Sequence, residues 1–327
     1  MPAITNSSVV LPVEYSREIQ KGIIGRSKAL ELGKRLPDMI GKTYKLNVMQ
    51  HLPIAGWVKN QTTPVGAPDE IKHKPLSVLA WEGVDLVAEE ISVIVPVSIN
   101  TLRDVENYVD IVPQINEEVI GAFDQVIDST LLFGTNSPWN NYTGIVAGAT
   151  SAGAVVSWNG QGGKTFYEAI SSAMEYVEKS GFMPDAILGS PSINAAFRNS
   201  ITDLGVNVAD QGEIGRLARH TDFTGGFDTS SAFAIVGDFK RGLVYAFRQE
   251  MEVRLLEEAT LYDSATGTTY YLAQQDMVAF RFTMRLGAAL PNPVTRVSGV
   301  LSSDGKYIEK GASAYPFAII TKSGASA

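Results

Sequence analysis

Residues 44–81 constrain this chain most, because they have the two strands of a hairpin without a core for the strands to share. Both ends of the segment are strand-like, and residues 59–68 between them form a polar run broken by prolines. An isolated two-stranded hairpin is only marginally stable in water. We therefore expect a long hairpin that lies on another surface, and a neighbouring subunit is the natural candidate.

Two amphipathic helices are predicted in the middle of the chain. The first follows Asp110, has Pro113 near its start, where a missing N–H costs nothing, and is stopped by Gly134. The second covers residues 166–180 and is closed by Gly181. Apolar residues recur in both at helical spacing.

The last third of the chain is predicted to form strands. Residues 252–261 are β-like, a turn is expected at 263–267, and a return strand begins at Tyr270, which together give a second long hairpin. Apolar and other residues then alternate strictly over 278–286, which predicts a strand with one buried face. Residues 301–327 form a tail with a turn at 304–305, and its role is open.

The N-terminal residues have little to bury within their own chain. Residues 1–42 are expected to form an extended arm followed by a short helix over 14–36, which Pro37 ends. The apolar residues of this helix form no continuous stripe.

Composition excludes several classes of function. The chain has 327 residues, which favours two domains, and a net charge of -8 without a Lys/Arg cluster, which disfavours a nucleic-acid-binding surface. An acidic surface would repel DNA, as suits a container for it. The absence of cysteine excludes disulfides, thiolate metal sites and a Cys nucleophile. The N-terminus lacks the pattern of a signal peptide.

Motifs for catalysis or metal binding are weak. The loop at residues 160–165 resembles a phosphate-binding loop, but Trp158 stands where that motif requires glycine, so a glycine-rich lead into the next helix is the better interpretation. The three histidines lack ligand spacing. Adjacent glutamates such as Glu117 and Glu118 point in different directions and define no acid–base site. We expect no catalytic residue, no metal and no cofactor.

Four stretches in order resemble the major capsid family of tailed bacteriophages, which has the Hong Kong ninety-seven-type fold. Residues 124–134 resemble the end of its long spine helix, and residues 182–191 a helix-to-strand passage. Residues 237–239, Gly-Asp-Phe, resemble a strand end, and residues 275–293 the closing strand. The resemblance extends to about Val300.

The resemblance implies an α+β fold with an N-terminal arm, an extended-loop hairpin, a peripheral domain and an axial domain. The expected division is an arm at 1–42, an extended loop at 43–82, a peripheral domain at 83–137 and 250–276, an axial domain at 138–249 and 277–300, and a C-terminal tail at 301–327.

The function implied is that of a virion shell protein and not an enzyme. Copies would assemble in the host cytoplasm as pentamers and hexamers into an icosahedral shell around double-stranded DNA. The partners implied are a separate scaffolding protein, a portal protein and possible decoration proteins, with no membrane. Two alternatives stay open: an encapsulin-type shell that packages a cargo enzyme, and an unrelated α/β enzyme that uses the loop at 160–165.

The residues expected to make contacts between subunits lie on the two hairpins. On the extended loop they are Trp57, Lys59, Pro64, Lys72 and His73. At the tip of the peripheral hairpin they are Asp263, Thr266 and Gly267. Some family members cross-link a lysine to an asparagine near this tip, but residues 263–268 contain no asparagine, so no cross-link is expected.

Overall fold

The computed structural model describes residues 23, 26–58, 72–100, 111–159, 164–199 and 217–322. Lys59 and Pro64, most of the N-terminal arm and residues 160–163 of the glycine-rich loop lie outside the described residues. No helix in the described ranges is long and apolar enough to cross a membrane.

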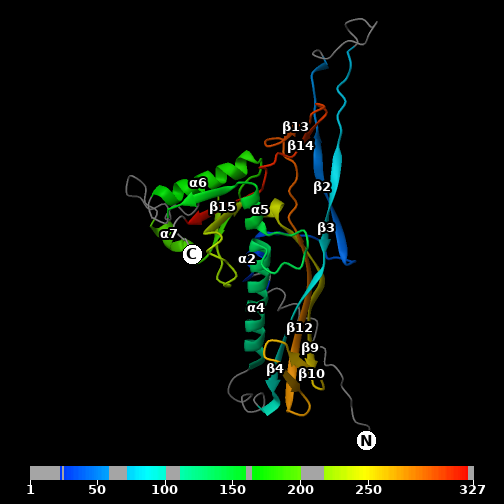
Figure 1. The fold of residues 1–327 in the computed structure, drawn as a ribbon, viewed down its shortest axis with the longest axis vertical. Helices are drawn as coiled ribbons and strands as arrows, with labels where there is room; N and C mark the ends of the chain where they lie inside the picture. The colour runs from blue at the N-terminus through cyan, green and yellow to red at the C-terminus, as the bar shows by residue number, and fades with distance from the viewer. Residues whose placement is uncertain are drawn as a thin grey trace.

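A four-stranded sheet with the order β1-β9-β12-β4 lies along the lower half of the long axis of the molecule in Figure 1. Its strands are β1 (Lys34–Arg35), β9 (Val244–Leu256), β12 (Met277–Ala289) and β4 (Glu89–Ser98). The alternation over 278–286 is confirmed as a strand with one strongly buried face, because Phe282 and Met284 are fully buried. Strand β12 pairs antiparallel with β4 on one side and with β9 on the other. Which strands lie beside β12 depends on contacts between residues that are far apart in the sequence.

The long helix α4 (Ile111–Phe133) lies against this sheet and shares one core with it. The predicted stop is confirmed, since Gly134 follows the helix with φ +73°. A Cβ at Gly134 would lie 2.3 Å from the Thr143 carbonyl oxygen, so the close approach of the next loop also requires glycine here.

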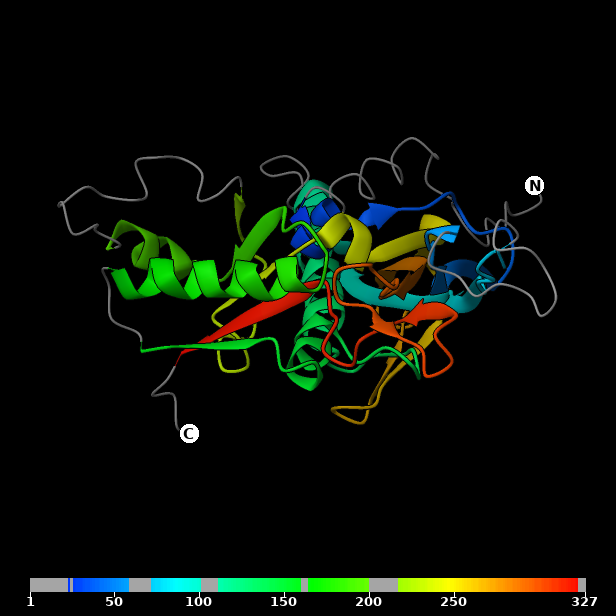
Figure 2. The same ribbon diagram turned by 90° about the horizontal axis from the view of Figure 1, so that it is seen from above.

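A five-stranded mixed sheet, ordered β5-β15-β8-β6-β7, lies on the other side of α4, as Figure 2 shows from above. The strands are β5 (Val155–Trp158), β15 (Phe317–Lys322), β8 (Ala234–Gly237), β6 (Ala186–Gly189) and β7 (Ala218–Thr221). The helices around it are α5 (Ile145–Ser151), α6 (Lys164–Lys179), α7 (Ile193–Arg198) and α8 (Phe239–Gly242). The second predicted helix is confirmed as α6.

The C-terminal tail is part of the core of this sheet. Strand β15 lies between β5 and β8, and Phe317 and Ile320 are fully buried. The sequence left the role of the tail open, and the structure gives it a central strand.

The predicted hairpin of residues 44–81 is confirmed, and it has two added strands. Strands β2 (Thr43–Pro53) and β3 (Ala80–Val87) pair antiparallel from Thr43 opposite Val87. Two short strands from the C-terminal segment, β13 (Val300–Leu301) and β14 (Tyr307–Glu309), complete the sheet order β13-β14-β2-β3.

The second long hairpin takes a different form from the one expected. The first half of the β-like stretch, residues 252–256, belongs to β9, which pairs with β12. The expected turn instead joins a short hairpin of β10 (Thr260–Asp263) and β11 (Thr268–Tyr271).

The described end of the arm packs on the body, which corrects the expectation that it buries little. Ile23, Ala29 and Leu30 are buried, and helix α2 (Lys28–Leu32) lies against α4. The helix ends at Gly33, four residues before Pro37, because the backbone of Lys34 and Arg35 pairs in parallel with β9.

Candidate assembly surfaces

The extended hairpin exposes large apolar side chains along its length. Figure 1 shows it running past β13 and β14 and beyond the rest of the chain. Trp57 is 83% exposed and Leu76 is 85% exposed. The other large apolar residues exposed on it are Tyr44, Val58, Val78, Leu79 and Trp81. Exposed large apolar side chains gathered on one element, rather than scattered singly over a surface, indicate an interaction site.

Basic residues lie beside this apolar surface. Lys72 is half-buried, and His73 and Lys74 are exposed. The structure therefore places Trp57, Lys72 and His73 in the outer part of the hairpin, near the ends of its described strands.

The C-terminal segment holds the hairpin at the outer end of its paired strands, a contact that sequence reasoning missed. Strand β14 pairs Tyr307 with Pro53, the last residue of β2, and the Tyr307 ring stacks on His51 with 4.0 Å between centroids. The Ser77 hydroxyl donates to the Lys306 carbonyl oxygen at 2.6 Å. These contacts tie β2 and the segment before β3 to residues 306–307, at the end of the strands opposite the pair of Thr43 and Val87.

A buried carboxylate on α4 holds the arm. Asp128 accepts hydrogen bonds from the Ser27 hydroxyl at 2.6 Å and from the backbone N–H groups of Lys28 and Ala29 at 3.2 and 3.0 Å. The Thr224 hydroxyl donates to it at 3.3 Å. Burial raises the pKa of Asp128 to about 6, against the lowering effect of these donors.

Asp124 lies one turn earlier on α4 and is fully buried. Neither of its carboxyl oxygens has a hydrogen-bond partner among the residues that the structure describes. Burial, together with the nearby charge of Asp128, raises the pKa of Asp124 to about 8. No group of three or more His, Cys, Asp or Glu residues within the described ranges could hold a metal ion.

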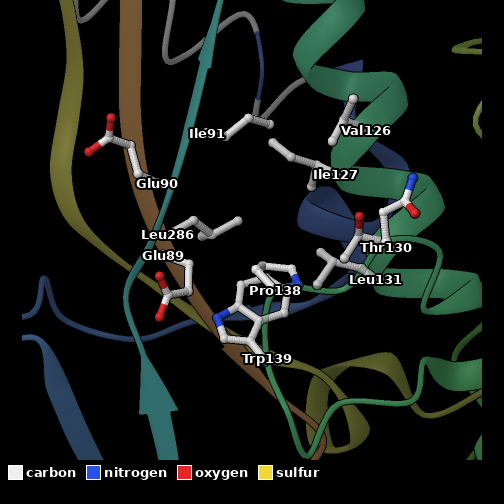
Figure 3. A pocket seen from close by; sticks show the side chains of 11 residues that line it. Glu89, Glu90, Ile91, Val126, Ile127, Thr130, Leu131, Pro138, Trp139 and Leu286 are labelled. Carbon is white, nitrogen blue, oxygen red and sulfur yellow. The ribbon is translucent and has the colours of Figure 1, made fainter. Parts of the chain in front are cut away.

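Trp139 separates two hollows that together form a groove, here named the Trp139 groove. Its indole N–H donates to the Val87 carbonyl oxygen at 2.7 Å, which fixes the ring between β3 and α4. The first hollow, of about 180 Å³, lies between α4 and β4 (Figure 3) and is lined mainly by Ile91, Val126, Ile127, Leu131, Trp139 and Leu286. The second, of about 450 Å³, lies beside β3 and includes Glu82, Asp85, Glu89, Asn140 and Asn141.

The residues expected at the tip of the peripheral hairpin form the turn between β10 and β11. Asp263 accepts hydrogen bonds from the Ala265 N–H at 2.9 Å and from the Thr266 hydroxyl at 2.6 Å. Gly267 has φ +69°, which the turn requires. The hydrogen bonds to Asp263 lower its pKa. This tip is exposed, and the Asp263 carboxylate is hydrogen-bonded within its own turn.

Comparison with known proteins identifies the class. The model of the phage capsid family matches residues 7–294. A solved chain from Mycobacterium phage Adephagia has 25% sequence identity and a TM-score of 0.75, with 92% of this chain and 91% of that chain covered. A chain from Microbacterium phage Oxtober96 has 28% identity and a TM-score of 0.72, covering 90% and 91%. The search of curated proteins found no match.

A more distant neighbour shares the fold alone. The capsid of an empty GTA particle has 12% identity and a TM-score of 0.57, covering 91% of this chain and 90% of that chain. Because the family model is that of the phage capsid family and the two nearer neighbours come from phages, the encapsulin-type alternative is not favoured. The chain belongs to the phage capsid family and is a major capsid protein that forms the shell of a tailed phage.

Proposed function

We propose that copies of this chain associate as pentamers and hexamers that close into an icosahedral shell around a double-stranded DNA genome. The hairpin carries this proposal, because it extends from the body with Trp57, Leu76 and Trp81 exposed to solvent in the single chain. Interfaces of obligate assemblies bury more than about 2,000 Å² and are more apolar than ordinary surface. A neighbouring copy would supply that burial.

In pentamers and hexamers, the same chain must meet its neighbouring copies at two different angles. Within the proposed division of the chain, the arm (1–42) and the extended loop (43–82) would absorb the difference. The peripheral domain would contain α4 with β10 and β11, and the axial domain the five-stranded sheet. In this division, β15 would add the tail to the axial domain, and β14, which pairs with Leu52 and Pro53, would add it to the extended loop.

Assembly of such a shell would involve other proteins besides copies of this chain. A separate scaffolding protein would set the curvature of the shell, and a portal protein would occupy one vertex. A decoration protein could bind the outer face. Assembly would take place in the host cytoplasm, and the net charge of -8 suits a wall that holds DNA without binding its sequence.

The test is electron microscopy and sedimentation of the chain expressed alone and, if needed, with the scaffolding protein. We expect closed shells, or rings of five and six. A variant that lacks residues 55–72 should keep the thermal unfolding of the body but form no stable shell. A substitution at the exposed Glu178 of α6, Glu178→Lys, is the control that should assemble normally. Normal shells from the deletion variant would refute the role of the hairpin.

A further inference from the structure

The described end of the arm depends on its contacts with the body of the chain. Helix α2 has five residues, and a helix of that length is not stable by itself in water. It is held by the burial of Ala29 and Leu30, by the pairing of β1 with β9, and by hydrogen bonds from its first turn to Asp128. Figure 1 shows α2 beside α4. A change of charge on α4 beneath this turn therefore changes how firmly the arm is docked.

Three buried carboxyl groups lie together at this contact. Asp124 and Asp128 are one turn apart on α4, and Asp222 comes from the loop that follows β7. The Thr224 N–H donates to one oxygen of Asp222 at 2.7 Å, whereas both oxygens of Asp124 lack a partner among the described residues. Burial, reinforced by the charges of Asp128 and Asp222, raises the pKa of Asp124 to about 8.

The two cations that face this group from the arm are paired with other carboxylates. Arg26 forms an ion pair with Glu117 at 2.6 Å, and Lys28 forms one with Glu31. The side chain of Arg26 is also half-exposed, so water screens its charge. Arg26 lowers the pKa of Asp124 by its charge but does not offset the effect of burial. Ionised Asp124 would therefore stand beside Asp128 without a cation of its own.

The arm is the side of this contact that can open. A hollow of about 660 Å³ lies beside Asp124, bounded by the arm, by α4 with the exposed Glu118, and by the loop at residues 223–224. The continuation of that loop is packed tightly on α4, because a Cβ at Gly226 would lie 2.7 Å from the Gln125 carbonyl oxygen. The short helix α2 has no such close backbone contact with α4 to hold it when the charge beneath it changes.

We propose that the proton on Asp124 is a latch for the arm: residues 26–33 stay docked on α4 while Asp124 is protonated and are released when it ionises beside Asp128. Release exposes both carboxylates to water, which solvates their charges. All the contacts of this latch lie within one chain, so the proposal holds whether or not the chain forms shells.

The sign of the pH dependence follows from proton binding. The pKa of Asp124 lies near 8 when the arm is docked and returns toward its ordinary value of 3.8 when the arm is released. The docked state therefore binds more protons between these two values, and docking weakens as the pH rises through this range. The constant for opening of the arm should increase roughly 30-fold between pH 6.5 and pH 9.

Hydrogen exchange of the full-length chain measures this opening. The backbone N–H groups of Lys28 and Ala29 donate to Asp128, so their exchange requires release of the arm. Mass spectrometry of peptides from residues 26–33 at several pH values gives the opening constant, once the pH dependence of intrinsic exchange is divided out. Residues 169–177 of α6 are the internal control. A rise of less than about threefold in the arm would overturn the proposal, as would an equal rise in α6, which would mean that the whole chain unfolds.

Neutral variants identify the group that titrates. Asp124→Asn has no proton to lose, so its opening constant should change less than about threefold over the same range, and Asp124→Ser gives the same test if the amide does not fit. Glu118→Gln, an exposed carboxylate on the same hollow, should keep the full rise. Asp128→Asn weakens the acceptor for α2 and should raise opening at every pH. A neutral variant of Asp124 that keeps the wild-type rise, or an Asp128→Asn arm as protected as that of the wild type, would overturn the latch.

Discussion

Asp124 and Asp128 show how one residue type plays two roles a single turn apart. Asp128 accepts hydrogen bonds from the start of the arm helix, so its burial is compensated by donors. Asp124 has no such donor, and burial raises its pKa to about 8. Burying an unpaired carboxylate is costly, so the folded chain holds a proton on Asp124 through neutral pH. The free-energy cost of burying Asp124 therefore depends on pH.

Asp124→Asn should stabilise the chain at alkaline pH. Because the folded pKa of Asp124 lies above its ordinary value of 3.8, the folded chain binds more protons than the unfolded chain between these values. Stability from this group is therefore lost as pH rises from about 4 to about 8. We expect the variant to gain roughly 1 to 3 kcal/mol at pH 8 and little at pH 4. Urea unfolding at several pH values measures the difference, with Glu178→Gln as control. An equal effect at both pH values would contradict this account.

The C-terminal segment contributes more to the fold than its sequence pattern indicates. It lies beyond the family match, which ends at residue 294, yet it supplies β14 to the outer end of β2 and β15 to the centre of the five-stranded sheet. Phe317 packs edge to face on Phe239, and a Cβ at Gly242 would lie 2.5 Å from its ring. Close packing around a central strand leaves no room for substitution.

Removal of residues 317–327 should abolish folding of the five-stranded sheet. The truncation removes a strand that bonds β5 on one side and β8 on the other, and it exposes both. We expect an insoluble chain, or one without a cooperative thermal transition. A chain that ends at Lys322 keeps β15 entire and is the control. A soluble, cooperatively unfolding chain after the longer truncation would show that β15 is dispensable.

At the scale of the whole molecule, the chain is a body with one hairpin that it cannot cover by itself. The arm contact is completed within the chain by Asp128, whereas the exposed apolar side chains of the hairpin need a neighbour to cover them. Many moderate contacts of this kind give an assembly kinetic stability without a covalent bond.

Shells of this protein should dissociate into single chains in hot detergent. The tip between β10 and β11, residues 263–268, contains no asparagine to accept a lysine, and the Asp263 carboxylate is held by its own turn. Denaturing electrophoresis of purified shells should give one band at the position of the single chain, with and without reductant. Bands at multiples of the chain mass that survive denaturation would contradict this.

Local sequence patterns predicted the helices and strands whose formation depends on residues close together in the chain. The spacing of apolar residues and the glycine stop located α4 and α6, and strict alternation located β12, because periodicity is a property of a short stretch of chain. The hairpin of residues 44–81 was also predicted, including the lack of a core that leaves Trp57 exposed. The order of these elements was enough to indicate the family.

Only the tertiary structure decided which distant segments meet. Ser27 and Asp128 are 101 residues apart, and no local pattern indicates that the arm is held there. The pairing of β12 with β9, the central place of β15 and the Trp139 groove likewise depend on contacts between remote segments. Sequence periodicity says which face of an element is buried, whereas its partner is set by how all the faces pack together.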